Sequence, residues 1–137
     1  MRRYLVLTSL TLVVALLPNQ AMAASAEDFV GVWASINEPD GSNVTITISI
    51  APPPGQLDVV LFDDGASVCD PDAPPEAPDV AAEARGRGTV DGNDLVGTWR
   101  LRCLGGHLEI HPVLPFVIRF LNATHLESGG VIYTKVS

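Results

Sequence analysis

The chain has 137 residues, enough for one domain, and it carries sixteen Asp and Glu against eight Lys and Arg. An acidic chain that lacks a basic patch is a poor partner for nucleic acid and for anionic membrane surfaces, because both are bound through clustered Lys and Arg. No stretch carries apolar residues at helical spacing over three turns, so we expect an all-β protein.

Residues 1–23 carry the three-part pattern of a secretory signal peptide. Two arginines precede an apolar run over residues 4–17, which is shorter than the ~20 residues that span a bilayer. Small residues before the junction predict cleavage after Ala23, with cleavage after Ala26 as the alternative. Cleavage after Ala23 removes two of the eight basic residues and no acidic one, so the net charge changes from −8 to −10. We expect a secreted or periplasmic protein, without stable membrane insertion, whose residues 24–137 form a single β-barrel domain.

The first part of this domain reads as three strands. Residues Gly31 to Ile36 contain a Gly-x-Trp sequence and lead into a turn with Pro, Asp and Gly. Residues Asn43 to Ile50 alternate Val and Ile with Thr and Ser, which is typical of a half-buried strand. A third strand is expected over Leu57 to Phe62, and a short extended piece over Ala66 to Cys69.

An acidic, proline-rich stretch follows from Asp70 to Asp79. Proline cannot donate a hydrogen bond to a sheet, and so many carboxylates cannot be buried together, so we expect an exposed loop. Weak calcium binding is the alternative, but the spacing of the acids is not that of an EF-hand loop.

The next two strands are expected over Val80 to Val90 and Leu95 to Leu104, joined by a tight turn with Gly and Asn. A short helix at the start of the first is the alternative. In the second strand, alternation places Trp99 and Cys103 on the inner face, opposite Arg100 and Arg102.

The last part is expected to form further short strands, over residues His107 to Ile110, Val113 to Leu121 with an interruption at Pro115, Thr124 to Glu127, and Val131 to Val136. The total is seven to nine strands. Short connections favour an antiparallel up-and-down meander that closes into a small barrel, because closure removes unpaired edges. We expect a monomer.

The two cysteines, Cys69 and Cys103, are expected to form a disulfide, since an even count in an exported chain is typical of one. The alternative is a pair of free, buried thiols. A bridge across this loop would stabilise the fold by roughly 3–4 kcal/mol in the chain-entropy model.

The sharpest candidate for chemistry is His107, Glu109 and His111, which share one face of an extended strand. Neighbours on that face are ~6.6 Å apart, so the outer two lie ~13 Å apart and cannot hold one ion unless the strand bends or His125 joins a pair. A solvent-facing polar side is the simpler interpretation. We therefore expect no metal, no cofactor, no catalytic residues and no enzymatic activity.

The strand Gly31-Val32-Trp33 resembles the Gly-x-Trp signature of lipocalin-like, calycin-type barrels. In that family the Trp closes one end of the barrel, and a cationic side chain from the last strand packs over its ring. The resemblance implies that Lys135 takes this place over Trp33, where the family more often uses Arg, and that the contact is worth ~0.5–2 kcal/mol.

The chain also resembles a group of small secreted bacterial proteins of uncharacterised function. The shared features are turn and strand residues, which support a fold and assign no catalytic residue: Trp33, 40–42, 62–66 with Cys69, 88–93 and 101–104.

The first functional hypothesis is an exported, non-enzymatic barrel that binds a small hydrophobic molecule inside, at residues that the sequence does not identify. An envelope protein-interaction or inhibitor module that presents the loop 70–79 is the alternative. The third is an enzyme that uses the region of His107, Glu109 and His111.

Overall fold

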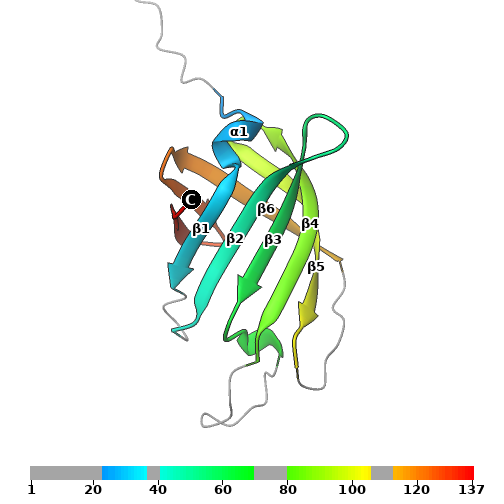
Figure 1. The fold of residues 1–137 in the computed structure, drawn as a ribbon, viewed down its shortest axis with the longest axis vertical. Coiled ribbons are helices and arrows are strands. Elements are labelled where there is room, and N and C mark those ends of the chain that lie inside the picture. The colour runs from blue at the N-terminus through cyan, green and yellow to red at the C-terminus, as the bar shows by residue number, and fades with distance from the viewer. Residues whose placement is uncertain (1–22, 37–40, 70–79, 106–112) are drawn as a thin grey trace, which may run out of the picture.

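The computed structural model describes residues 23–36, 41–69, 80–105 and 113–137. They form an all-β, antiparallel meander of eight strands that closes into a barrel of about 8 Å radius. In chain order the elements are α1 (Ala26–Phe29), β1 (Gly31–Ile36), β2 (Asn43–Ala51), β3 (Gln56–Asp63), the 3-10 turn η1 (Ser67–Cys69), β4 (Ala82–Asp91), β5 (Asp94–Cys103), β6 (Val113–Asn122), β7 (His125–Ser128) and β8 (Val131–Lys135). The expected fold class is confirmed (Figure 1).

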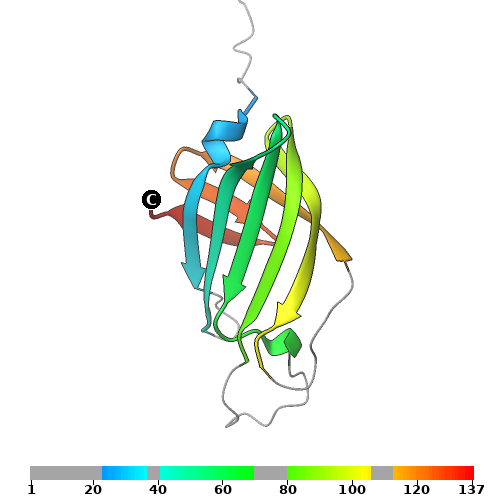
Figure 2. The ribbon, with the colours of Figure 1, turned by 45° about the vertical axis from the view of Figure 1, so that its right-hand side comes forward.

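Each strand pairs with the next, and β8 returns to β1 to close the barrel. Trp33 lies opposite Lys135 and Ala34 lies opposite Thr134 in this closing ladder. Figure 2 shows α1 over one end of the barrel and η1 near the other. No helix in the described part of the chain is long and apolar enough to cross a membrane.

The short helix α1 was not predicted from the sequence. The carboxylate of Asp28 accepts hydrogen bonds from the Ser25 backbone N–H at 2.7 Å and from the Ser25 hydroxyl at 2.9 Å. These bonds occupy donors at the start of the helix and lower the pKa of Asp28. A single turn lacks the long apolar periodicity that identifies a helix, and α1 is held by the burial of Phe29.

β4 is a strand, as expected, and it begins at Ala82. The piece expected over Ala66 to Cys69 is the turn η1, and not a strand. The strand expected over His107 to Ile110 lies outside the described residues.

β6 runs through Pro115 without a break, so the expected interruption there was wrong. The Phe120 N–H donates to the Asn93 carbonyl at 2.8 Å. Backbone groups alternate sides along a strand, so those of the odd-numbered residues of β6 face away from β5. Pro115 pairs with Thr98, but its nitrogen faces away from that strand, and no hydrogen bond to β5 is lost.

The core is built from inward side chains that α1 and every strand except β4 supply: Phe29, Trp33, Val44, Ile46, Ile48, Leu57, Val59, Leu95, Phe116, Ile118, Leu126 and Tyr133. From Ala82 to Gly88 the inward positions of β4 are alanine and glycine, and Val90 packs against the edge of the core. A second, smaller cluster surrounds the disulfide and includes Ala66 and Ala82. Because β4 has no large inward side chain before Val90, its backbone at Gly88 lies close to the core residues Leu95 and Phe116 of β5 and β6.

Candidate functional site

The closed end of the barrel is organised around Trp33. Its side chain is fully buried, and its indole N–H donates to the Phe29 carbonyl at 2.8 Å. The Lys135 ammonium lies 5.0 Å from the centre of the Trp33 ring, which is within the range of a cation–π contact. The contact that the family resemblance implied is therefore present.

Gly31 makes this arrangement possible. Its φ is +142°, a conformation that L side chains rarely adopt. A Cβ at this position would lie 2.5 Å from the Ser137 carbonyl oxygen and 2.7 Å from the Cε atom of Lys135, so a larger residue would disturb both the backbone where the chain ends meet and the lysine over the ring. The two ends of the domain meet here, where the Val32 N–H donates to the Ser137 carbonyl at 2.7 Å. These contacts close the barrel and bury the Trp33 side chain at its end, which is a structural role.

The disulfide between Cys69 and Cys103 is present, with the two Cα atoms 5.6 Å apart. It joins η1 to the last residue of β5, and both cysteines are buried. The bridge therefore fixes the end of β5 that carries Arg102.

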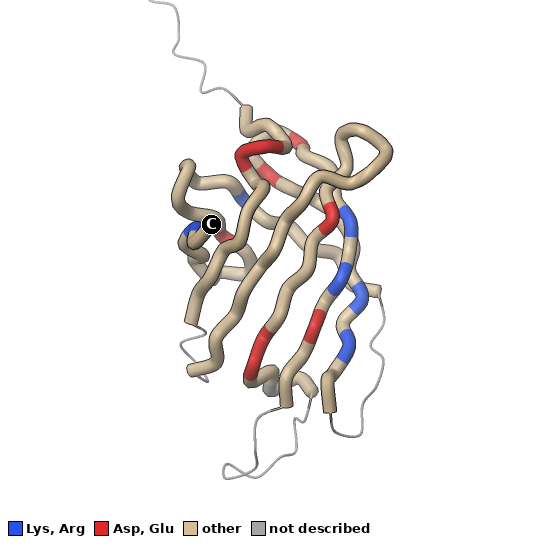
Figure 3. The backbone as a smooth tube through the Cα atoms, in the orientation of Figure 1, with Lys and Arg blue, Asp and Glu red and all other residues tan. Residues whose placement is uncertain are grey.

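A basic face covers the outside of β4 and β5. Four of the six Lys and Arg among the described residues project from this pair of strands: Arg85, Arg87, Arg100 and Arg102. In the register Arg85 lies opposite Arg100, and Glu83 lies opposite Arg102. Figure 3 shows them as a blue band along these two strands. We call these four arginines the arginine face.

Two members of the arginine face are paired with carboxylates. Arg85 donates two hydrogen bonds to Glu83, at 2.6 and 2.8 Å, and these bonds are the main reason that the pKa of Glu83 is lowered. Arg87 donates to Asp58 at 2.7 Å and to the Pro52 carbonyl at 3.3 Å.

The other two members keep their donors available. Arg100 and Arg102 are exposed, and neither makes a hydrogen bond or an ion pair to another described residue. Within the described part of the chain, the arginine face therefore retains two guanidinium groups that donate no hydrogen bond, although the charge of Arg102 contributes to the lowered pKa of Glu83 opposite it.

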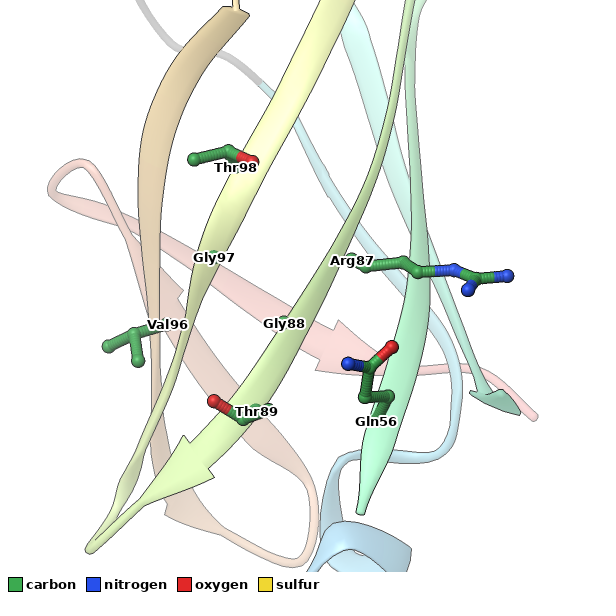
Figure 4. Close-up of a pocket in the computed structure, with 7 residues that line it drawn as sticks. All are labelled: Gln56, Arg87, Gly88, Thr89, Val96, Gly97 and Thr98. Carbon is green, nitrogen blue, oxygen red and sulfur yellow. The ribbon is translucent and has the colours of Figure 1, made fainter. Parts of the chain in front are cut away.

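Two adjoining hollows lie along this surface. One, of about 190 Å³, is lined by Glu83, Arg85, Arg100 and Arg102. The other, of about 230 Å³, is lined by Gln56, Arg87, Gly88, Thr89, Val96, Gly97 and Thr98. In Figure 4 the side chains of Val96 and Thr98 point to one side and those of Gln56 and Arg87 to the other, with the two glycines between them.

Small residues bring this wall of the barrel close to the core. Gly88 lies directly opposite Gly97. A Cβ on Gly97 would lie 2.7 Å from the Phe116 ring and would also meet the carbonyl of Arg87. On the inner side the Phe116 ring packs against Trp99, with ring centres 4.8 Å apart. Both missing side chains would point inward, so the two glycines let the backbone of β4 and β5 pack directly on Phe116, beneath the larger hollow.

The residues singled out from the sequence as metal ligands, His107, Glu109 and His111, lie outside the described residues, as does the loop 70–79. His125 is described, and its Nδ1 lies 2.9 Å from the Thr124 hydroxyl and 3.1 Å from the side-chain oxygen of Asn122. It is the first residue of β7, next to the turn that follows β6. Within the described ranges no three His, Cys, Asp or Glu side chains are grouped so that they could hold a metal ion.

The arginine face was not predicted from the sequence, and the premise that the chain lacks a basic patch was wrong. The signal was present as arginines two residues apart in each of two strands joined by the turn 91–93. Hairpin pairing brings such arginines onto one face. The expectation that nucleic acid is not a partner stays a prediction.

Comparison of the chain with protein-family models, with curated proteins and with solved structures finds no match. Fold and surface chemistry therefore carry the functional argument.

Proposed function

We propose that this protein is an exported, non-enzymatic binding module that meets its partner on the outer face of β4 and β5. The observation that carries the proposal is the arginine face, where an acidic chain places four of the six basic side chains of its described part. Charges that gather on one surface of a protein with the opposite net charge are suited to a specific anionic partner. The role is that of the interaction module considered above, at a surface other than the loop 70–79.

Membership of the calycin-type barrels is part of this proposal. Its support is the eight-stranded closed meander together with Gly31, the buried Trp33 and Lys135 over its ring. A binding role is favoured over a catalytic one because the described residues that line the two hollows include no His, Cys or Ser, and their one carboxylate, Glu83, is paired with Arg85.

A small apolar ligand inside the barrel is the weaker candidate. Twelve buried side chains pack into a continuous core around Trp33. Barrels of eight strands have interiors that side chains alone can fill. The apolar positions that would contact such a ligand contact one another instead.

The test uses the exported protein in its own host. We expect part of it to sediment with cell-envelope material at low salt and to be released at high salt, because exposed charges are screened. The double variant R100Q/R102Q should lose this association. The control variant R119Q should retain it, because Arg119 lies on β6 and is paired with Asp94 of β5.

Native mass spectrometry of the same purified protein tests whether a molecule is bound inside the barrel. We expect the measured mass to equal that of the polypeptide alone, with no apolar molecule bound. A stoichiometric apolar ligand, or a protein that never sediments with the envelope, would overturn the proposed function.

A further inference from the structure

We infer that the arginine face and the adjoining larger hollow form one site for an anionic polysaccharide that carries carboxylate or sulfate groups. The inference rests on the proposed function and deepens it by naming the chemistry of the partner. Its basis is the combination, on one exposed surface, of unused guanidinium groups with neutral hydroxyl and amide groups.

The anionic part of the ligand is matched by Arg100 and Arg102. They are two residues apart on β5, so their Cα atoms lie ~6.6 Å apart, and Arg85 faces Arg100 across the strands at ~5 Å. A planar guanidinium can hold a carboxylate or sulfate through two parallel N–H donors. Successive acidic groups along one chain can therefore be bound together.

The neutral part of the ligand is matched by the larger hollow. Its rim carries the hydroxyls of Thr89 and Thr98 and the amide of Gln56, and each of these groups can donate and accept hydrogen bonds. Thr98 precedes Arg100 by two residues on the same face of β5, so the two hollows adjoin along this strand. Sugar hydroxyls require this kind of donor and acceptor.

Single-stranded nucleic acid shares the anionic character but fits the surface less well. Its binding sites combine positive charge with aromatic side chains on which bases stack. The described residues that line the two hollows include no aromatic side chain, and Trp99 of β5 packs inward on Phe116. Phe62 of β3 is exposed opposite Glu83, but a single ring does not stack successive bases.

An acidic protein partner would need apolar anchors within the site. Among the described residues that line the hollows Val96 is the sole large apolar one, and the exposed Val113 and Val117 lie beside them on β6, opposite Arg100 and Val96.

The experiment measures binding of the exported protein to four immobilised polymers. These are polygalacturonate, which carries carboxylates, dextran sulfate, uncharged dextran, and a single-stranded DNA oligonucleotide. We expect binding to one or both of the anionic polysaccharides and none to uncharged dextran. Which of the two binds distinguishes carboxylate from sulfate recognition.

Matched variants locate the site. R100Q and R119Q each remove one positive charge, so they differ in place and not in net charge. We expect R100Q to weaken polysaccharide binding about tenfold, and R119Q less than twofold, because the lost hydrogen bonds are charge-assisted. R100K/R102K should give a partial loss, since an ammonium keeps the charge but not the paired donors. Unchanged thermal unfolding midpoints show that the variants fold.

Binding to neither anionic polysaccharide would overturn the inference. So would DNA binding of equal or greater strength, or an R119Q effect as large as that of R100Q. If envelope association depends on the arginine face while neither anionic polysaccharide binds, the proposed function stands and this inference fails.

Discussion

The Trp33 end of the barrel and the outer face of β4 and β5 use their residues in opposite ways. At the first, Trp33 and Phe29 are fully buried, and a lysine is held over a ring. At the second, Arg100 and Arg102 are exposed and make no ion pair to another described residue. The difference separates the region that stabilises the fold from the surface proposed to bind a partner. Substitutions at the first should change the free energy of unfolding, and substitutions at the second should change binding.

The largest expected effect is that of W33A. Removal of this side chain leaves a cavity and removes the hydrogen bond to Phe29, so we expect the free energy of unfolding to fall by ~3–5 kcal/mol. Urea titration followed by circular dichroism measures it. K135M, which keeps most of the aliphatic stem, should cost only ~0.5–2 kcal/mol. A W33A loss no larger than that of K135M would contradict the role given to this end.

The double variant C69A/C103A should lower the free energy of unfolding by about 3–4 kcal/mol, because the bridge closes a long loop in the unfolded chain. The loss should also be local. Hydrogen exchange should increase near Cys103 and Arg102 in β5 more than near Trp33. Uniform acceleration over the whole barrel would show that the two regions unfold as one unit.

The buried side chain of Tyr133 makes the stability of the fold depend on pH at alkaline values. Burial, followed by the charge of Asp63, raises its pKa from 10.0 to about 12. The unfolded chain releases this proton near pH 10 and the folded chain near pH 12, so stability should fall as pH rises through that window. Y133F should remove this part of the loss. Urea midpoints at pH 8 to 11.5 test it, and parallel pH curves for the two proteins would contradict it.

The smallest expected effect on stability is that of R100Q. Arg100 is exposed and has no hydrogen-bond or ion-pair partner among the described residues, so its loss should change the free energy of unfolding by less than about 0.5 kcal/mol. The same variant should weaken binding about tenfold if the arginine face is the site. A stability loss as large as that of K135M would show that this face supports the fold.

If the leader is removed as expected, α1 favours cleavage after Ala23 over cleavage after Ala26. The first junction retains Ser25, whose backbone N–H and hydroxyl donate to Asp28, and the Ala24 nitrogen, which donates to Asn93 at 2.9 Å. The second junction would remove these partners. The intact mass of the exported protein distinguishes the two, and the mass of the shorter product would contradict this expectation.

The strands were accessible from the sequence because their signal is local. Alternation along β2 identifies the inward Val44 and Ile46 without knowledge of any other strand. Two features could not be predicted in this way. The helix α1 depends on the burial of Phe29, and the continuity of β6 depends on which side of the strand the Pro115 nitrogen faces.

The sequence by itself therefore determined the all-β meander and the Gly-x-Trp strand at its start, because side-chain alternation and turn residues act over a few positions. Only the tertiary structure decided that Arg85 lies opposite Arg100, that Gly88 lies opposite Gly97, and that hollows form beside them. Such contacts depend on cross-strand register and on how closely the barrel wall packs on its core, and both are properties of the closed barrel.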